Sequence, residues 1–259
     1  MGEREHDGVA VNKSSRKRGV LSRLGLDRPE LRAWAMYDWA VSSVQTTIMV
    51  AVFPVYFANI AKGDLGESRT TQAIATANTI VAIILAVLSP VLGAVSDYVA
   101  AKKRMLGASM IVGAAAVAGM FFVQQGDYRL ALVLFVISLI GATASTIFYD
   151  ALLPHIAAED EIDRVSSAGY AVGYIGGGLL LALNLAWILK PGWFGLPTGA
   201  ALSSAQKTLP TRLALLSVAV WWLVFSIPLF RRVPGPPRTR EPDELTGGRV
   251  LVAPFVRVG

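Results

Sequence analysis

The sequence predicts an all-α membrane protein with six transmembrane helices, on three observations. Hydrophobic residues make up 54% of the 259 residues and charged residues only 16%, whereas soluble domains carry about 25% charge. Six stretches contain no charged residue: 39–61, 70–96, 105–126, 130–149, 165–189 and 213–230. About 20 apolar residues cross a hydrocarbon core of about 30 Å, so each stretch is long enough. None shows the regular polar alternation of a barrel strand, so the spans are expected to be helices.

The first three helices are predicted over residues 34–60, 71–96 and 105–124. Gly63-Asp64-Leu65-Gly66 is a turn signal between the first and the second, because glycine and aspartate favour tight turns. The last three helices are predicted over residues 129–149, 165–189 and 212–230, separated by an acidic loop and a loop rich in glycine and proline. The chain is therefore divided into a basic tail (1–33), a six-helix bundle (34–230) and the start of a cytoplasmic central loop (231–259), which we expect to be truncated.

Lys and Arg residues predict the orientation. If both ends of the chain are cytoplasmic, 18 of the 24 Lys and Arg residues lie on the inner side and 6 on the outer side. This bias follows the positive-inside rule and predicts a multi-pass protein with its N-terminus in the cytoplasm. The membrane we expect is the bacterial inner membrane. The same rule accounts for the net charge of +6, so no nucleic-acid partner is expected.

Nothing in the chain predicts an enzyme. The sequence has no cysteine, and its two histidines, His6 and His155, lack the spacing of metal ligands. It contains no phosphate-binding loop and no catalytic triad. We therefore expect no catalytic residue, no metal and no cofactor.

A charged loop follows the second predicted helix. Gly93 and Asp97 come first, and the basic cluster Lys102, Lys103 and Arg104 follows. Asp97 lies at the C-terminal end of one helix and the cations lie at the N-terminal start of the next, and both placements oppose the helix dipole. Such charges are expected to pair with one another or with the end of another helix. The alternative is an ordinary positive-inside loop.

This loop resembles the Gly-x-x-x-Asp…basic signature of the major facilitator superfamily. The segments Trp34–Thr47, Val52–Phe57 and Phe148–Ala157 are similar to one branch of it, the autophagy-related vacuolar amino-acid effluxers and their bacterial relatives. The resemblance implies the N-terminal half of a major facilitator fold, built from two inverted repeats of three helices. It also implies that Gly93, Asp97 and the basic cluster form an inner latch, whose partner includes a helix of the second half.

A second group of residues places polar side chains inside or beside the predicted spans. Asp38 enters the first helix after Tyr37, and Asp150 follows Tyr149 at the end of the fourth. Acids within spans are costly and face protein or cavities. We therefore predict that the cavity or gate residues are Tyr37, Asp38, Gln45, Asn78, Tyr149 and Asp150. The alternative for the first helix is a solvated start with tryptophans at the membrane interface.

The fifth predicted helix carries a run of glycines. The glycines expected to pack against another helix are Gly169, Gly173, Gly177 and Gly178. Glycine costs about 1 kcal/mol in a helix interior, so a run of them needs a structural reason. Four-residue spacing forms a smooth face for close helix contact. That face serves either tight packing alone or a surface that bends or slides during transport.

These features and the resemblance lead to one main function and one alternative. We expect a secondary transporter of a small polar solute, with amino acids as one candidate, that works by alternating access as part of an incomplete chain. The alternative is a non-transporting six-helix scaffold, or a half-transporter that needs a partner half. The expected partners are the lipid bilayer, a small polar solute, and either a missing C-terminal half or a homodimer partner.

Overall fold

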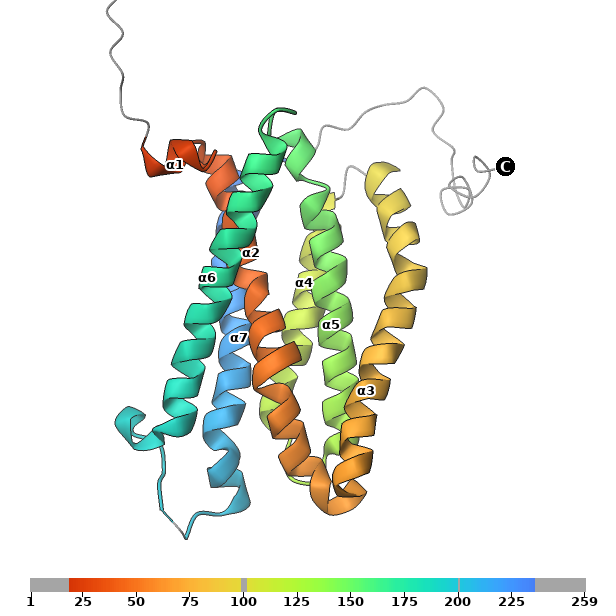
Figure 1. Cartoon of the computed structure of the whole chain (residues 1–259). Helices are drawn as coiled ribbons and strands as arrows, with labels where there is room; N and C mark the ends of the chain where they lie inside the picture. The colour runs from red at the N-terminus through yellow and green to blue at the C-terminus, as the bar shows by residue number, and fades with distance from the viewer. Residues whose placement is uncertain (1–18, 99–101, 200, 236–259) are drawn as a thin grey trace, which may run out of the picture.

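The computed structural model describes residues 19–98, 102–199 and 201–235, except for the side chains of residues 20 and 94–98. It is a bundle of long helices (Figure 1): α1 (Val20–Arg23), α2 (Pro29–Ser43), α3 (Phe53–Tyr98), α4 (Lys102–Gly119), α5 (Tyr128–Asp150), α6 (Ile162–Leu189) and α7 (Ser204–Arg232). A π-helical segment, Val44–Ala51, joins α2 to α3. Short 3-10 turns follow α4, α5 and α6 at Met120–Phe122, Leu153–His155 and Pro191–Phe194.

The described chain crosses the bundle six times. Five helical stretches are long and apolar enough to span a membrane, and the first of them, Pro29–Gly93, reverses its direction at Gly66 (Figure 1). Gly66 has φ 72° and ψ 170°, which a residue with a Cβ rarely adopts. The predicted all-α fold of apolar membrane helices is confirmed. Below, the end of the bundle that carries α1 is the α1 end, and the opposite end is the Gly66 end.

The helix contacts follow the expected two repeats of three helices. The first leg of the first repeat, α2, packs on α6 and α7, whereas the first leg of the second repeat, α5, packs on α3 and α4. In addition, α4 packs on α7. The first repeat is α2, α3 and α4, and the second is α5, α6 and α7. If the helices of one repeat are exchanged with those of the other, each of these contacts is converted into a contact of the same set, as an internal two-fold axis requires.

Glycine and aromatic residues form the centre of the bundle. A Cβ on Gly141 of α5 would lie 2.6 Å from the Cα atom of Gly113 in α4, so these two backbones are in direct contact. The ring of Trp222 from α7 covers the same place, 2.8 Å from a Cβ on Gly113. In lipid, helices associate through such close packing, because lipid chains are as apolar as the side chains.

Two helices, α2 and α7, begin at least five residues earlier than predicted. α2 begins at Pro29 and not at Trp34, because proline suits the first helical position and Glu30 suits the positive end of the helix. Residues 29–33 therefore belong to the bundle and not to the tail. α7 begins at Ser204 and not at Arg212, because Ser203 and Gln206 form a capping box and Pro210 is accommodated within the helix. Residues 1–18 of the predicted tail and residues 236–259 of the predicted loop lie outside the described residues.

Candidate functional site

The contact between α2 and α6 is made by glycines of α6, and we call it the glycine seam. A Cβ on Gly169 would lie 2.7 Å from Cζ3 of Trp34. A Cβ on Gly173 would lie 2.7 Å from Oγ of Ser42, and one on Gly177 would lie 2.9 Å from the carbonyl oxygen of Ser42. Real Cβ contacts at these distances are essentially absent, so the two helices could not approach this closely with alanines in these places.

The fourth predicted glycine, Gly178, does not belong to the seam. A Cβ there would meet nothing within 4 Å, and Gly178 is exposed. Gly176 takes its place, because a Cβ on it would lie 2.5 Å from Cδ2 of Trp39 and 2.6 Å from the Trp39 carbonyl oxygen. Successive residues point about 100° apart on a helix, so Gly178 turns away while Gly169, Gly173 and Gly177 face α2.

Asp38 lies in the glycine seam. Its side chain is 8% exposed, and a Cβ on Gly173 would lie 3.1 Å from both its Cγ and its Oδ1 atom. Ser42, one helical turn further along α2, is the polar side chain beside it. No Lys, Arg or His of the described chain forms an ion pair with Asp38. The Asp38 carboxylate is therefore enclosed beside the backbone of α6, without a cation of the described chain as its ion-pair partner.

Asp150, the last residue of α5, is an exposed second acid near Asp38. The two acids flank the same contact, because the ring of Trp34, one helical turn before Asp38, stacks on the ring of Tyr149, which directly precedes Asp150. Asp150 also lies at the negative end of its own helix, which disfavours its charge. Among the described side chains, no ion pair compensates it. Both acids lie toward the α1 end of the bundle, and neither forms an ion pair with a cation of the described chain.

An aromatic stack holds the two acids together. The rings of Trp34 and Tyr149 stack with centroids 4.3 Å apart, and Tyr37 lies 5.0 Å from Tyr149. Nε1 of Trp34 donates to the carbonyl oxygen of Tyr149 at 3.2 Å. The hydroxyl groups of Tyr37 and Tyr149 are buried and have no hydrogen-bond partner among the described residues. The stack thus fixes the end of α5 against α2.

The π-helical segment extends the seam toward the Gly66 end. Thr46 Oγ1 lies 3.2 Å from the Gly177 carbonyl oxygen and 3.2 Å from the Ser42 carbonyl oxygen, so it bridges the two helices. Gln45, a predicted cavity residue, is exposed on the same segment. π-Helical turns are rare and often occur at functional sites. The sequence gives no simple signal for this segment, since its residues also suit an ordinary helix.

Asn78, the remaining predicted cavity residue, lies apart from the seam. It is half-buried in α3, and its Oδ1 atom has no partner among the described residues. α3 packs mainly on α5 and on the π-helical segment. The structure therefore brings Tyr37, Asp38, Tyr149 and Asp150 together and places Asn78 on a different helix contact.

Two residues of the predicted inner latch, Lys102 and Lys103, contact the ends of other helices. Nζ of Lys102, which is 8% exposed, lies 3.4 Å from the carbonyl oxygen of Ala151 and 3.0 Å from Nε2 of His155. Nζ of Lys103 donates to the carbonyl oxygen of Val233 at 2.7 Å. Ala151 and Val233 are the C-terminal caps of α5 and α7. Each lysine therefore neutralises the negative end of another helix.

The other latch residues are less engaged. Arg104 is exposed, and Gly93 is half-buried in α3. The side chain of Asp97 lies outside the described residues, although its backbone belongs to α3. The dipole of their own helix disfavours the charges of Lys102 and Lys103, and the carbonyl oxygens at the ends of α5 and α7 compensate for this.

Comparisons with known proteins agree with this architecture. A family model described as "Vacuole effluxer Atg22 like" matches residues 26–259. The chain is 30% identical over 202 residues to a Bacillus subtilis protein named as an uncharacterized MFS-type transporter, YxiO, covering 78% of this chain and 46% of the relative. Autophagy-related protein 22 of Yarrowia lipolytica is 34% identical over 83 residues, covering 31% of this chain and 12% of the relative.

A further relative, autophagy-related protein 22-2 of Aspergillus clavatus, is 33% identical over 83 residues, with 31% of this chain and 12% of the relative covered. No solved structure matches the chain. The chain spans about half the length of YxiO, 46%, and a smaller share of the fungal relatives. The relatives that it matches thus include a protein named as a transporter of the major facilitator superfamily.

Proposed function

Since the chain belongs to the family described as "Vacuole effluxer Atg22 like", we propose that it forms one half of a secondary transporter for a small polar solute. It is a multi-pass integral membrane protein, and its relatives are transporter-like. Alternating access is the mechanism proposed, with the glycine seam as the moving contact and the acids at the α1 end as part of the solute or ion path.

Asp38 is the observation that carries the proposal. An acid at the centre of a span costs about 2.5–3.5 kcal/mol on insertion scales, and less near the interface. Asp38 bears part of this cost at 8% exposure, without an ion pair in the described chain. A carboxylate kept under these conditions supports a role in binding a cation, a proton or a positively charged part of a solute.

The second wall of the site is proposed to come from another six-helix half. Solute sites of this superfamily lie near the bilayer midplane between repeats, so one half supplies one wall. The second half would be either a further part of a longer chain or a second copy of this one. The mass of the native polypeptide, detected through an N-terminal epitope, separates these cases. A product near 27.6 kDa favours a second copy, and one near twice that mass favours a longer chain.

The proposed setting is the bacterial inner membrane, with the α1 end facing the cytoplasm. The distribution of Lys and Arg supports this orientation, because 18 of 24 lie in segments assigned to that side. Amino acids are the first solutes to test. The family description names an effluxer, so export from the cytoplasm is the proposed direction.

The test is solute flux through the full chain reconstituted in lipid vesicles, with amino acids, sugars and peptides offered in turn. Asp38→Asn should lower flux at least tenfold while the helical content stays unchanged, because it removes the charge and keeps the shape. Asp160→Asn is the matched control, since Asp160 is an exposed acid of the α5–α6 connection. Wild-type flux in Asp38→Asn would reject the role of Asp38. If no solute moves at all, the alternative of a non-transporting scaffold is favoured.

A further inference from the structure

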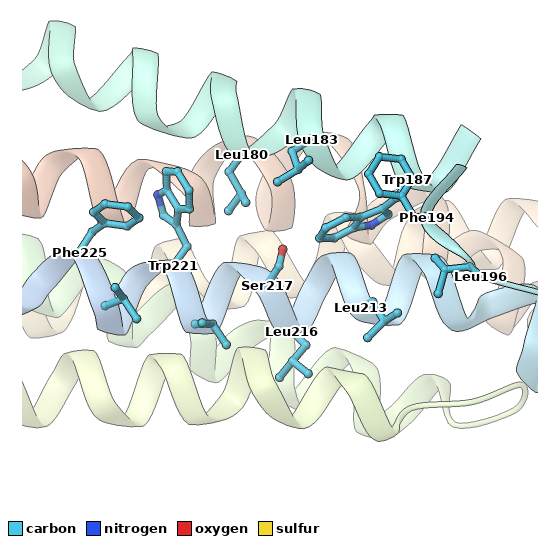
Figure 2. A pocket seen from close by; sticks show the side chains of 12 residues that line it. Leu180, Leu183, Trp187, Phe194, Leu196, Leu213, Leu216, Ser217, Trp221 and Phe225 are labelled. Atoms are coloured by element: carbon cyan, nitrogen blue, oxygen red, sulfur yellow. The ribbon is translucent and has the colours of Figure 1, made fainter. Parts of the chain in front are cut away.

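A groove runs along the outside of the bundle between α6 and α7. It has a volume of about 530 Å³. Leu180, Leu183 and Trp187 from α6 face Leu213, Ser217 and Trp221 from α7 across it (Figure 2). Because these residues lie in two membrane spans, the groove opens in the part of the bundle that the bilayer surrounds.

Two polar groups of the groove, the hydroxyl of Ser217 and the indole N–H of Trp221, are turned into the protein. Oγ of Ser217 lies 2.9 Å from Oδ1 of Asn184, which is fully buried, and 2.7 Å from the carbonyl oxygen of Ala214. Nε1 of Trp221 donates to the carbonyl oxygen of Trp39. A polar solute would therefore find few hydrogen-bond partners in the groove, whereas a hydrocarbon chain needs none.

The length of the groove suits one leaflet of a bilayer. Its α7 wall extends from Leu213 to Phe225, which is about 18 Å at 1.5 Å per residue. Half of a hydrocarbon core of about 30 Å is about 15 Å. An acyl chain that starts at the Gly66 end of the groove would thus reach roughly to the middle of the membrane.

A polar pocket lies at the Gly66 end of the same two helices. Its volume is about 250 Å³, and Thr198, Gln206 and Lys207 are among the residues that line it. Lys190, the C-cap of α6, directly precedes Pro191, which also lines this pocket, and its Nζ lies 6.0 Å from the ring centroid of Trp193. Residues 185–215 contain no Asp or Glu, and the third cation there, Arg212, already donates to the carbonyl oxygens of Ala205 and Phe121.

From this combination we propose that the α6–α7 groove binds an anionic phospholipid. One acyl chain lies in the apolar groove, and the phosphate lies at the Gly66 end near Lys190 and Lys207. Neither lysine forms an ion pair in the described chain, so both charges are available to a phosphate. This site is separate from the acids of the glycine seam, and it does not depend on transport.

The bundle contains its own control for this proposal. A groove of about 560 Å³ between α3 and α5 is also mainly apolar, and it includes Ile80 and Val133. Its Gly66 end carries both signs of charge, since Arg69 lines it and Glu67 forms a 3.6 Å ion pair with Lys62. The two grooves match in volume, but residues 62–69 carry two acids and two cations, whereas residues 185–215 carry three cations and no acid, so an anionic lipid should prefer the α6–α7 groove.

Native mass spectrometry of the purified full chain tests the proposal, with phosphatidylglycerol and phosphatidylcholine of identical chains as probes. We expect one phosphatidylglycerol to be retained more strongly than phosphatidylcholine. Replacing either lysine by alanine should weaken that preference about fivefold, and Lys190→Ala with Lys207→Ala should abolish it. Leu183→Trp should fill the groove and release both lipids, whereas Val133→Trp in the control groove should leave retention unchanged.

Three outcomes would overturn the proposal. The first is equal retention of the two lipids, which would show that the lysines do not select a headgroup. The second is an equal effect of Leu183→Trp and Val133→Trp, which would show nonspecific lipid contact. The third is a mass of twice the chain that Leu183→Trp reduces to a single chain, which would place a second copy of the protein in the groove. Circular dichroism of each variant shows whether its helices are intact.

Discussion

Gly173 and Asp38 occupy the same small space between α6 and α2. A Cβ on Gly173 would lie 3.1 Å from the Asp38 carboxyl carbon, so the absence of a side chain on one helix makes room for the charge on the other. The two residues are 135 positions apart in the sequence. The glycine run and the buried acid are therefore parts of one feature, and substitutions in the first should affect the second.

Gly173→Ala should destabilise the protein, although alanine favours helices. The gain in helix propensity is about 1 kcal/mol, but overpacking a close contact costs about 1–3 kcal/mol. Gly178→Ala is the matched control, because a Cβ there meets nothing within 4 Å. We expect thermal unfolding in detergent to occur earlier for Gly173→Ala and unchanged or later for Gly178→Ala. Equal midpoints for the two variants would contradict the seam geometry.

Gly141→Ala should have a larger effect than Gly173→Ala, whose new Cβ would meet side-chain atoms only. The added Cβ would lie 2.6 Å from the Cα atom of Gly113 and 2.9 Å from the carbonyl oxygen of Ser109, and backbone atoms cannot move aside. We expect a loss of about 3 kcal/mol in the free energy of unfolding, because α4 and α5 must separate. Chemical unfolding in mixed micelles measures it.

Gly119→Ala tests the same helix pair where the contact is softer. A Cβ there would lie 3.2 Å from Cδ2 of Leu134, the end of a flexible side chain. Its cost should be clearly below that of Gly141→Ala. If Gly119→Ala were the more damaging of the two, the direct backbone contact between α4 and α5 would not be the closest point of their packing.

The three cations of the basic cluster, Lys102, Lys103 and Arg104, should differ in how much they contribute to the free energy of unfolding. Lys103→Met removes the donor to the carbonyl oxygen of Val233, and Lys102→Met removes the one beside Ala151. Methionine keeps much of the apolar stem, so each loss should reflect the missing charge at a helix end, about 0.3–2 kcal/mol. Arg104→Met should change nothing measurable, because Arg104 is exposed.

Hydrogen exchange gives this prediction a local readout. Lys103→Met should speed exchange in the last turn of α7, and Lys102→Met should do so in the last turn of α5. Uniform exchange changes across the bundle, or a loss in Arg104→Met equal to those of the lysines, would argue for an ordinary positive-inside loop without capping contacts.

The sequence by itself determined the class of the protein. Charge-free stretches as long as 70–96 and 165–189 can lie only in lipid as helices, and their apolar character is legible without any knowledge of their neighbours. The family followed from the charged loop after the second helix and from the segments around Asp38 and Asp150, and the comparisons confirm it. The glycine spacing also predicted a packing face on the fifth span, since four-residue spacing keeps residues on one side of a helix.

Only the tertiary structure decided which side chains meet. It assigned Gly176 and not Gly178 to the seam, it paired Gly113 with Gly141, and it directed Lys102 and Lys103 to the ends of α5 and α7. It also placed Asn78 on a different helix contact from Asp38. The physical reason is that span formation depends on the local transfer of residues into lipid, whereas these contacts depend on the rotation and height of each helix relative to the others. Those relations join residues that are between 28 positions (Gly113 and Gly141) and 137 positions (Trp39 and Gly176) apart, and no local pattern in the chain records them.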